Sequence, residues 1–529
     1  MLRNAASLYG RHSMEYLYAM SKTGEHYADT ANADYSKKKA MQYFVPAAEK
    51  ALSLEKGSLR CADVLMPYLQ FLLSTRKEKY ALEYADALYL IFDNAARERF
   101  GGFSREQILV WLKQHRRYSD VLFAILDRSN LSREQEDMLY NMCLIEKCAF
   151  SASKYDEAVS QVRFEDVKKV LAQNDVAVEF ASYEYNGKCY YTSSLLRSGW
   201  NHPRKYSICV QNDTLTSLVA NKVMISKIDE MYYMIWGNLA SEFRKTDRIW
   251  FSPAGDFHLL GIEYCKIPQS INTYISDQYQ MHRVFSTARL ITMRFRSNTR
   301  TPVKLASLYG NVFYGEGRWR DLQNTVHEIN NVSRVLTDAG YYVSKFTRKE
   351  ADKKSFLAMS GKKIGIIHIA THGFSFRITD DDSPFGASGI LLANGNCAFS
   401  GDSVYFTKCD GVLLANEVDT MHLPDTRLVV LSACRSGFGT VIADNVVGMQ
   451  SALRYAGAEA VMTSLWDVND EATSLLMSTF YHEYLTTRKS LQESLRTAQA
   501  EIRRHTFAHQ NIMFEGREPK FWAGFIIYE

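Results

Sequence analysis

Hydrophobic and polar positions divide the chain into an amino-terminal helical part and a carboxyl-terminal part that contains strands. Between residues 13 and 150, apolar and aromatic residues recur every three or four positions, as in the stretch from Val64 to Phe100. That spacing predicts amphipathic helices. Beyond Asn174, short apolar runs alternate with helical stretches, which is the pattern of a sheet covered by helices. We therefore expect an all-α arm followed by an α/β body.

Two descriptions of the helical arm remain open. Paired helices of this kind are typical of tetratricopeptide-like repeats, but a clean period of about 34 residues is absent. An ordinary helical bundle packed on the α/β body explains the same pattern. Ser104 and Ser132 are predicted helix starts, because each has a glutamine three residues further on, as in a capping box.

The α/β body carries strand and turn signals in a regular order. The stretch from Val176 to Leu196 predicts two strands joined by a turn at Asn186-Gly187. Residues 297–302 form a predicted joint. From Lys304 to Phe346, a strand, a helix and a second strand follow one another, which is the order found in parallel α/β sheets.

The two most apolar runs each end in a reactive side chain followed by glycine. They are IGIIHIATHG, which contains His372, and LVVLSACRSGFG, which contains Cys434. Runs this apolar are typical of strands that are buried on both faces of a parallel sheet. Chemistry in such sheets collects at the carboxyl ends of strands, so a thiol and an imidazole delivered to one edge predict a cysteine nucleophile with its base.

The glycine after the histidine has a predicted role of its own. Gly373 lets the backbone approach a substrate without a side chain in the way. The amides of Gly373 and Cys434 are the expected donors to an oxyanion, the kind of fixed stabilisation on which acyl transfer depends. The competing interpretation is plain packing, since a free cysteine at the end of an apolar strand is most often a buried core residue.

Other chemistries fit these residues less well. His368 lies four residues before His372 inside the same run, and we interpret it as a hydrogen-bonded core histidine. The two histidines mimic the spacing of a helical zinc site, but the glutamate that such a site needs is absent. Ser432 and Ser436 flank the cysteine without the G-x-S-x-G pattern of a serine hydrolase.

Composition favours a soluble intracellular protein. The chain has 529 residues and a net charge of +4, so no DNA binding is expected. Nine irregularly spaced cysteines argue against a disulfide framework and indicate a reducing compartment. The amino terminus lacks an apolar signal-like segment, and no run reaches the roughly 18 apolar residues of a spanning helix. We therefore expect a cytoplasmic protein without membrane insertion.

The two motifs HIATHG and LSACRSG resemble the catalytic motifs of CHAT-domain cysteine proteases, a clan CD-like family related to caspases and separases. The histidine precedes the cysteine by 62 positions. Further stretches carry the resemblance from about Phe164 to the end of the chain, in the family's order: DGVLLANEV (410–418), GAEAVMTSLWDVNDEAT (457–473) and FWAGFIIYE (521–529).

This resemblance implies a caspase-like, mostly parallel sheet flanked by helices and preceded by the helical arm. The implied units are residues 1–165 for the possibly repeat-like arm, 166–300 for a non-catalytic half and 301–529 for a catalytic half. In the implied mechanism Cys434 attacks a protein substrate and His372 is the base, with no metal or cofactor. Relatives are often latent until a partner or ligand, here expected at the arm, activates them. Some act in bacterial defence by cutting a gasdermin or a companion protein.

Specificity is expected at the end of the strand after Gly457, which lines the substrate pocket in the caspase-like fold. Trp466, Asp467 and Asp470 lie there, and an acid in the pocket favours a basic residue before the scissile bond. Alternatively, Asn469 or Asp470 only caps the following helix. The polar segment from Phe374 to Gly389 is either a loop that orders on activation or a solvated turn.

Two other functions remain open. A scaffold that binds partners through the helical arm would retain the fold without the chemistry. A transpeptidase or ligase would use the same acyl-enzyme, because the sequence does not tell whether water or an amine resolves it.

Overall fold

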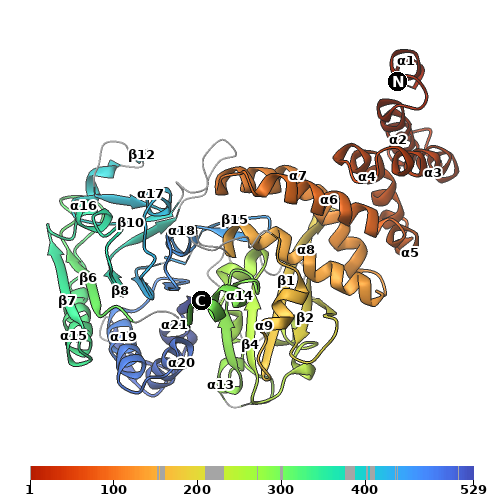
Figure 1. Cartoon of the computed structure of the whole chain (residues 1–529). Helices are drawn as coiled ribbons and strands as arrows, with labels where there is room; N and C mark the ends of the chain where they lie inside the picture. The colour runs from red at the N-terminus through yellow and green to blue at the C-terminus, as the bar shows by residue number, and fades with distance from the viewer. Residues whose placement is uncertain are drawn as a thin grey trace.

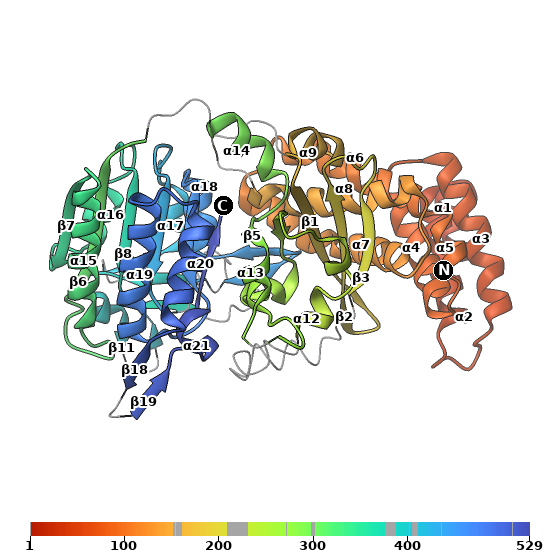
Figure 2. The same cartoon turned by 90° about the horizontal axis from the view of Figure 1, so that it is seen from below.

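The computed structural model describes residues 2–151, 154, 161–208, 231–270, 272–297, 302–375, 388–400, 403–404, 411–434, 436–437, 439–509 and 512–529. Figure 1 shows a helical arm and two α/β halves that follow one another across the molecule. Seen from below in Figure 2, the order is the same, with the amino-terminal helices at one end and the carboxyl terminus between the two halves.

The arm is entirely helical. Its helices are α1 (Leu2–Tyr9), α2 (Met14–Ala28), α3 (Lys37–Leu54), α4 (Leu59–Ser74), α5 (Glu78–Leu82), α6 (Ala85–Phe100), α7 (Arg105–Asp127) and α8 (Arg133–Ser151). The predicted capping boxes at Ser104 and Ser132 are confirmed, because each serine hydroxyl accepts from the backbone N–H of its glutamine and each glutamine Oε1 accepts from the backbone N–H of its serine. Among the described residues, no helix is both long and apolar enough to cross a bilayer.

The first half of the body follows the arm. Its helices are α9 (Phe164–Val170), α12 (Met231–Ile235), α13 (Ile275–Gln278) and α14 (Arg289–Ser297), with short 3₁₀ turns at Ala240–Glu242, Gly255–Leu259 and Ile262–Tyr264. Its strands are β1 (Asp175–Tyr185), β2 (Lys188–Arg197), β3 (Arg204–Ile208), β4 (Arg248–Ser252) and β5 (Gln280–Arg283). The predicted hairpin is confirmed: β1 and β2 pair antiparallel, and Asn186 and Gly187 both have positive φ, as a two-residue hairpin turn requires.

The second half contains the two apolar runs. Its strands are β6 (Leu305–Val312), β7 (Tyr342–Arg348), β8 (Ile366–Ala370), β9 (Gly373–Ser375), β10 (Ser388–Leu391), β11 (Phe399–Ser400), β12 (Ser403–Val404), β13 (Val412–Leu414), β14 (Leu428–Ser432), β15 (Thr440–Ile442), β16 (Asn445–Val447), β17 (Ala460–Ser464), β18 (Thr506–His509), β19 (Ile512–Glu515) and β20 (Phe525–Tyr528). Its helices are α15 (Asn324–Asp338), α16 (Lys353–Leu357), a 3₁₀ turn at Gly395–Ala398, α17 (Ala415–Asp419), α18 (Met449–Ala456), α19 (Asp470–Leu485), α20 (Leu491–Ile502) and α21 (Pro519–Trp522).

Both halves contribute to one sheet of 11 strands in the order β3-β2-β1-β4-β5-β20-β17-β14-β8-β6-β7. From β7 to β17 every neighbouring pair is parallel, whereas β20 pairs antiparallel with β17. The two halves meet where Tyr528 of β20 pairs with Arg283 of β5. The expected fold class, a mostly parallel α/β sheet after an all-α arm, is confirmed.

The apolar runs are continuous because helices cover both faces of the sheet. Along β8, Ile366 and Ala370 face the core under α15 and α19, while Ile367 and Ile369 face the core under α16, α17 and α18. Alternate residues of a strand point to opposite faces, so a strand buried on both sides needs an apolar residue at nearly every position.

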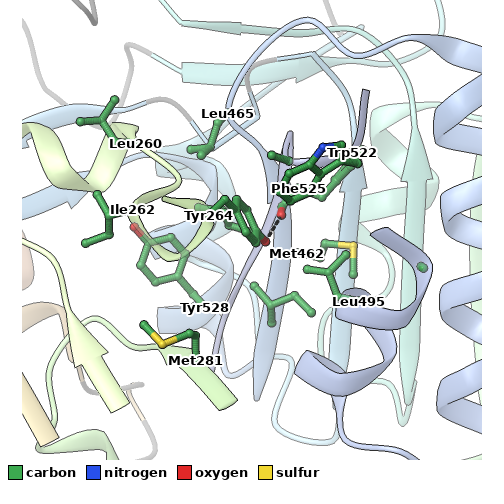
Figure 3. Close-up of a cluster of buried hydrophobic side chains, with 14 of the residues drawn as sticks. Leu260, Ile262, Tyr264, Met281, Met462, Leu465, Leu495, Trp522, Phe525 and Tyr528 are labelled. Atoms are coloured by element: carbon green, nitrogen blue, oxygen red, sulfur yellow. Dashed lines mark hydrogen bonds between the residues drawn. The ribbon is translucent and has the colours of Figure 1, made fainter. Parts of the chain in front are cut away.

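The joint between the halves is a shared hydrophobic core, drawn in Figure 3. Tyr264 and Met281 of the first half lie beside Trp522, Phe525 and Tyr528 of the second half (Figure 3). The Tyr264 hydroxyl donates a 2.6 Å hydrogen bond to the Phe525 carbonyl across this joint. The two halves therefore form one packed unit rather than two bodies on a linker.

Among the described residues, five cysteines are outside any disulfide: Cys61, Cys143, Cys189, Cys265 and Cys434. Cys397 is disulfide-bonded, which differs from the expectation for a reducing compartment.

Candidate active site

His372 and Cys434 lie at equivalent places on neighbouring strands. β8 and β14 are parallel and adjacent, and Ala370 pairs with Ser432 at their last shared position. The Thr371 N–H donates to the Ser432 carbonyl at 3.2 Å, which continues the pairing one step further. His372 and Cys434 each follow two residues after that last pair. Because neighbouring strands lie about 4.8 Å apart, both residues reach the same small part of the carboxyl edge. We call them the strand-end pair.

Backbone contact at this edge explains the glycine after the histidine. A Cβ atom on Gly373 would lie 2.7 Å from the Cys434 carbonyl oxygen, closer than real contacts allow. Gly373 begins β9, and the His372 carbonyl accepts a hydrogen bond of 2.9 Å from the Leu391 N–H. The two strand ends are thus in direct backbone contact, and only glycine fits between them. The role of the Gly373 and Cys434 amides as oxyanion donors stays a prediction.

One ring nitrogen of His372 is committed to a hydrogen bond. Nε2 lies 2.8 Å from the Arg320 carbonyl oxygen, which can only accept, so Nε2 carries the hydrogen. The neutral ring then has its lone pair on Nδ1, the nitrogen available to take a proton. Tyr314 and Trp319 hold the ring between them, with ring centroids 4.8 and 4.9 Å away.

The segment that carries the Arg320 carbonyl is fixed by one buried amide. The Asn396 side chain accepts a hydrogen bond from the Trp319 N–H at 2.8 Å and donates to the Trp319 and Gly315 carbonyls at 2.8 and 2.9 Å. Asn396 is only 3% exposed. Sequence reasoning missed both groups, because a backbone carbonyl has no residue signature and Asn396 is 76 positions from Arg320.

The electrostatics of the site favour a neutral base. Burial lowers the pKa of His372 below its ordinary value of 6.5, while the Arg320 carbonyl and the charges of Asp470 and Asp321 act in the opposite direction. The imidazole is therefore neutral near pH 7 and able to accept a proton. Cys434 is a partly exposed thiol outside any disulfide, and it lies at the same edge.

Two serines hold the turn after β14, which we call the Cys434 loop. The Ser464 hydroxyl donates to the Ala433 carbonyl at 2.6 Å, and the Ser464 N–H donates to the Ser436 hydroxyl at 3.0 Å. The Ser464 carbonyl also accepts from the Gly437 N–H at 2.8 Å. These contacts fix the backbone on both sides of the thiol. In the sequence, the only indication of these contacts is a small polar residue, Ser464, at the end of the neighbouring strand β17.

The three residues expected to set specificity lie in different surroundings. Trp466 is 8% exposed and its Nε1 donates to the Lys520 carbonyl at 3.1 Å, so its ring packs toward α21. Asp467 is exposed. Asp470 is exposed at the start of α19, where Asn469 is the cap and accepts from the Ala472 N–H. Of the three, Asp470 is the one whose charge acts on His372.

Three further predictions from the sequence concern His368, a metal site and the polar segment after Phe374. His368 is fully buried, with Nε2 2.9 Å from a Glu328 carboxylate oxygen and Nδ1 3.2 Å from the Tyr481 hydroxyl, as expected for a core histidine. In the described part of the chain, no group of three or more His, Cys, Asp or Glu side chains is placed to hold a metal ion. Most of the polar segment after Phe374, residues 376–387, lies outside the described residues.

Comparisons with known proteins add a family to this geometry. A stretch of 119 residues is 32% identical to mouse Tetratricopeptide repeat protein 28, and a stretch of the same length is 31% identical to the human protein of that name. Each match covers 22% of this chain and 4% of the relative, so the chain corresponds to a small part of their length.

Two solved structures are similar in fold at low identity. A chain of the Saccharomyces cerevisiae separase-securin complex gives a TM-score of 0.44 and 10% identity over 99% of this chain and 47% of that chain. The Arg specific cysteine proteinase gingipain R gives a TM-score of 0.32 and 11% identity over 60% of this chain and 68% of that chain.

Residues 226–529 match the CHAT domain, and this match includes both apolar runs, the strand-end pair and every strand from β4 onward. It confirms the resemblance carried by HIATHG and LSACRSG. Because the match covers more than half of the sequence, the chain belongs to the CHAT domain family.

Proposed function

We propose that the protein is a cysteine endopeptidase in which Cys434 is the nucleophile and His372 the base. The observation that carries the proposal is the register of β8 and β14, which brings both residues to the same edge of the sheet. The family membership and the partial exposure of Cys434, which is outside any disulfide, give further support.

In the proposed mechanism, His372 Nδ1 takes the proton of the Cys434 thiol while the sulfur attacks the peptide carbonyl carbon. The oxyanion accepts hydrogen bonds from the Gly373 and Cys434 amides. The imidazolium then gives its proton to the leaving amine as the C–N bond breaks, and water hydrolyses the thioester. The Arg320 carbonyl accepts the Nε2 hydrogen throughout and stabilises the imidazolium between the two transfers.

The proposed substrate is a protein with a basic residue before the scissile bond. Asp470 supports this preference because its carboxylate acts on His372 from the start of α19. Asp467 is exposed three residues before Asp470 and would add a second negative charge to the substrate pocket. Trp466 would form part of the wall of that pocket. A peptide series with Arg, Leu, Met or Asp before the cut tests the preference, and faster cleavage after an apolar residue would contradict it.

The wider role that we propose follows from family resemblance. The protease is latent until a partner or ligand engages the helical arm, it works in the cytoplasm, and its substrate is a gasdermin or a companion protein in bacterial defence. Addition of the products of neighbouring genes to the purified protein tests this role, because they are the natural source of the partner and the substrate.

The experiment that tests the proposed chemistry compares Cys434→Ala with Cys189→Ala. Cys189 is the matched control, since it is also a half-buried thiol outside any disulfide but lies on β2 of the first half. We expect cleavage of a peptide library, read by mass spectrometry, to vanish in Cys434→Ala and to persist in Cys189→Ala.

Two outcomes would overturn the proposal. Equal cleavage by wild type and Cys434→Ala would assign the activity to another protein. Equal cellular effects of the two proteins, without cleavage by either, would favour the scaffold that binds partners through its arm.

A further inference from the structure

A strained hairpin follows the Cys434 loop. β15 and β16 pair antiparallel, and β15 begins six residues after Cys434. Ala443 and Asp444 form the turn with φ of 42° and 56°, in the left-handed region that non-glycine residues rarely adopt. Such conformations are unfavourable and persist only where the surroundings hold them. The contacts of the turn therefore hold it in this conformation and indicate its role.

Asp444 is held by residues from outside the second half. Its carboxylate oxygens accept hydrogen bonds from the Ser182 N–H at 3.0 and 3.2 Å and a further one from the Ser182 hydroxyl. Its backbone carbonyl accepts from Nε2 of His258 at 2.9 Å. Arg116 Nη2 lies 3.7 Å from the carboxylate. Asp444 is 2% exposed, so this is a buried contact. We call Arg116, Ser182, His258 and Asp444 the Asp444 cluster.

Arg116 brings the helical arm into this cluster. It lies on α7, pairs with Glu146 of α8 and with Asp120 at 2.9 Å, and donates to the Ser182 carbonyl at 2.6 Å. The next hairpin residue, Asn445, donates to the Glu146 carbonyl at 2.8 Å. Helices α7 and α8 of the arm thus both contact the hairpin turn.

One face of α7 continues these contacts along the second half. Arg105, at the start of α7, pairs with Asp419 of α17 and lies over the ring of Tyr455 on α18, 5.0 Å from its centroid. Leu109 packs against Val447 of the hairpin. Residues 105, 109 and 116 are spaced by four and seven positions, so they share one side of the helix. In Figure 1, α7 runs from the arm across to the region of β15 and α18.

The hairpin is connected to the Cys434 loop at both ends. After β16, Gly448 caps α18, and the fully buried Gln450 of α18 donates to the Gly437 carbonyl at 2.9 Å. The start of α18 therefore holds the loop from one side, while β15 continues it on the other. His372 belongs to β8 and is outside this connection. A displacement of the hairpin would move the thiol relative to the imidazole.

We propose that Arg116 and Asp444 are positioning residues through which helix α7 of the arm sets the place of Cys434 relative to His372. The proposal rests on the protease function proposed above. A movement of α7 would displace the hairpin turn. That displacement would reach the Cys434 loop through the hydrogen bond between Gln450 and Gly437. The alternative is that the cluster only stabilises the fold, as buried ion pairs can.

The test compares Asp444→Asn, Arg116→Gln and the double variant with the matched control Arg117→Ala. Asparagine keeps the shape of Asp444 and an acceptor for Ser182 but removes the charge that Arg116 meets. Arg117 is the next residue of α7 and pairs instead with Asp63 of α4, away from the second half. Turnover, KM, melting temperature and the rate at which a peptidyl acyloxymethyl ketone labels Cys434 are measured for each protein.

We expect kcat and the labelling rate to fall about ten-fold in each single variant with KM unchanged, because small displacements of reacting groups are costly. The double variant should lose less than the product of the two single losses, since both changes break the contact between Arg116 and Asp444. Arg117→Ala should match wild type. If kcat and labelling of folded Asp444→Asn and Arg116→Gln equal those of wild type, whatever their melting temperatures, the cluster is only structural and the proposal is wrong.

A milder variant covers the case in which these proteins do not fold. Ser182→Ala removes the hydroxyl that donates to Asp444 and accepts from Arg116 at 3.2 Å, but it keeps the Ser182 N–H, and we expect a two- to three-fold fall in kcat. The labelling rate also separates this proposal from the protease function. Wild type that labels no faster than His372→Ala would contradict the function itself, whereas fast wild-type labelling with unchanged cluster variants would contradict only the present inference.

Discussion

One histidine lies in the buried middle of β8 and another follows the carboxyl end of the same strand, and the two have different hydrogen-bond partners. His368 lies in the buried middle, and its two ring nitrogens are 2.9 and 3.2 Å from Glu328 and Tyr481. His372 lies just beyond the end, where Nε2 is bonded to the Arg320 carbonyl and Nδ1 has no hydrogen bond within the described residues. The comparison shows that residue type alone does not identify the base. A histidine can take a proton only where the fold leaves one ring nitrogen available to accept it.

Exchange of each histidine for alanine is the strongest test of this comparison. We expect His372→Ala to lower turnover about 10²- to 10⁴-fold and to lower the melting temperature less than His368→Ala does, because it removes the base and only its ring contacts with Tyr314 and Trp319. His368→Ala should cost about 2–4 kcal/mol of unfolding free energy, since it leaves Glu328 and Tyr481 without their partner. Turnover per folded molecule and thermal unfolding are measured for both.

The comparison would fail if the two phenotypes were exchanged. A His368→Ala protein that is stable but inactive would place the base inside the sheet and leave His372 as a structural residue.

Gly373→Ala should give the next largest effect. The added Cβ would meet the Cys434 carbonyl oxygen at 2.7 Å, so the two strand ends must separate. We expect about a 100-fold loss of turnover, since displacements near 1 Å at reacting groups have effects of that size. Gly101→Ala is a control for the substitution, because nothing lies within 4 Å of the Cβ that it would add and its φ of −65° accommodates any side chain. Unchanged turnover in Gly373→Ala would show that the strand ends tolerate separation.

Asn396→Ala should have a smaller effect. It removes the three hydrogen bonds that hold Gly315 and Trp319, and it frees the segment that carries the Arg320 carbonyl. We expect about a ten-fold fall in kcat, because the ring of His372 loses its fixed orientation. Asn396→Asp keeps the acceptor for the Trp319 N–H and should lose less. Equal kcat in both variants and wild type would show that other contacts orient His372.

The smallest expected effect is in the pH profile. Burial lowers the pKa of His372 below 6.5, so its neutral form persists to lower pH than that of an ordinary histidine. The acid limb of kcat/KM should therefore lie below pH 6.5 and move further down in Asp321→Asn, since the Asp321 charge raises this pKa. High salt should weaken that shift, because Asp321 is exposed. An acid limb above pH 6.5 would contradict a buried base.

The sequence predicted the strands of the site and missed much of what fixes its geometry. Apolar runs identify β8 and β14 because helices bury both faces of a parallel sheet, and their ends locate His372 and Cys434. The Arg320 carbonyl and the Asn396 amide are invisible to pattern analysis, because one is backbone and the other meets its partners only in the folded chain.

The same limit applies to the larger architecture. The hairpin at Asn186-Gly187 was predictable from its local turn signal. The continuous sheet through both halves was not, since the register of Tyr528 with Arg283 joins strands that are far apart in the chain. The contact of Arg116 with Asp444 also has no local signature, because two charged residues on distant segments are common in any sequence.

The most direct measurement is the rate at which a peptidyl acyloxymethyl ketone labels Cys434 in wild type and in His372→Ala, read by intact mass. If the two residues act as a nucleophile and its base, labelling of Cys434 in the variant should be about 100-fold slower. Equal labelling rates in two folded proteins would contradict the account, because the thiol would then react without the imidazole.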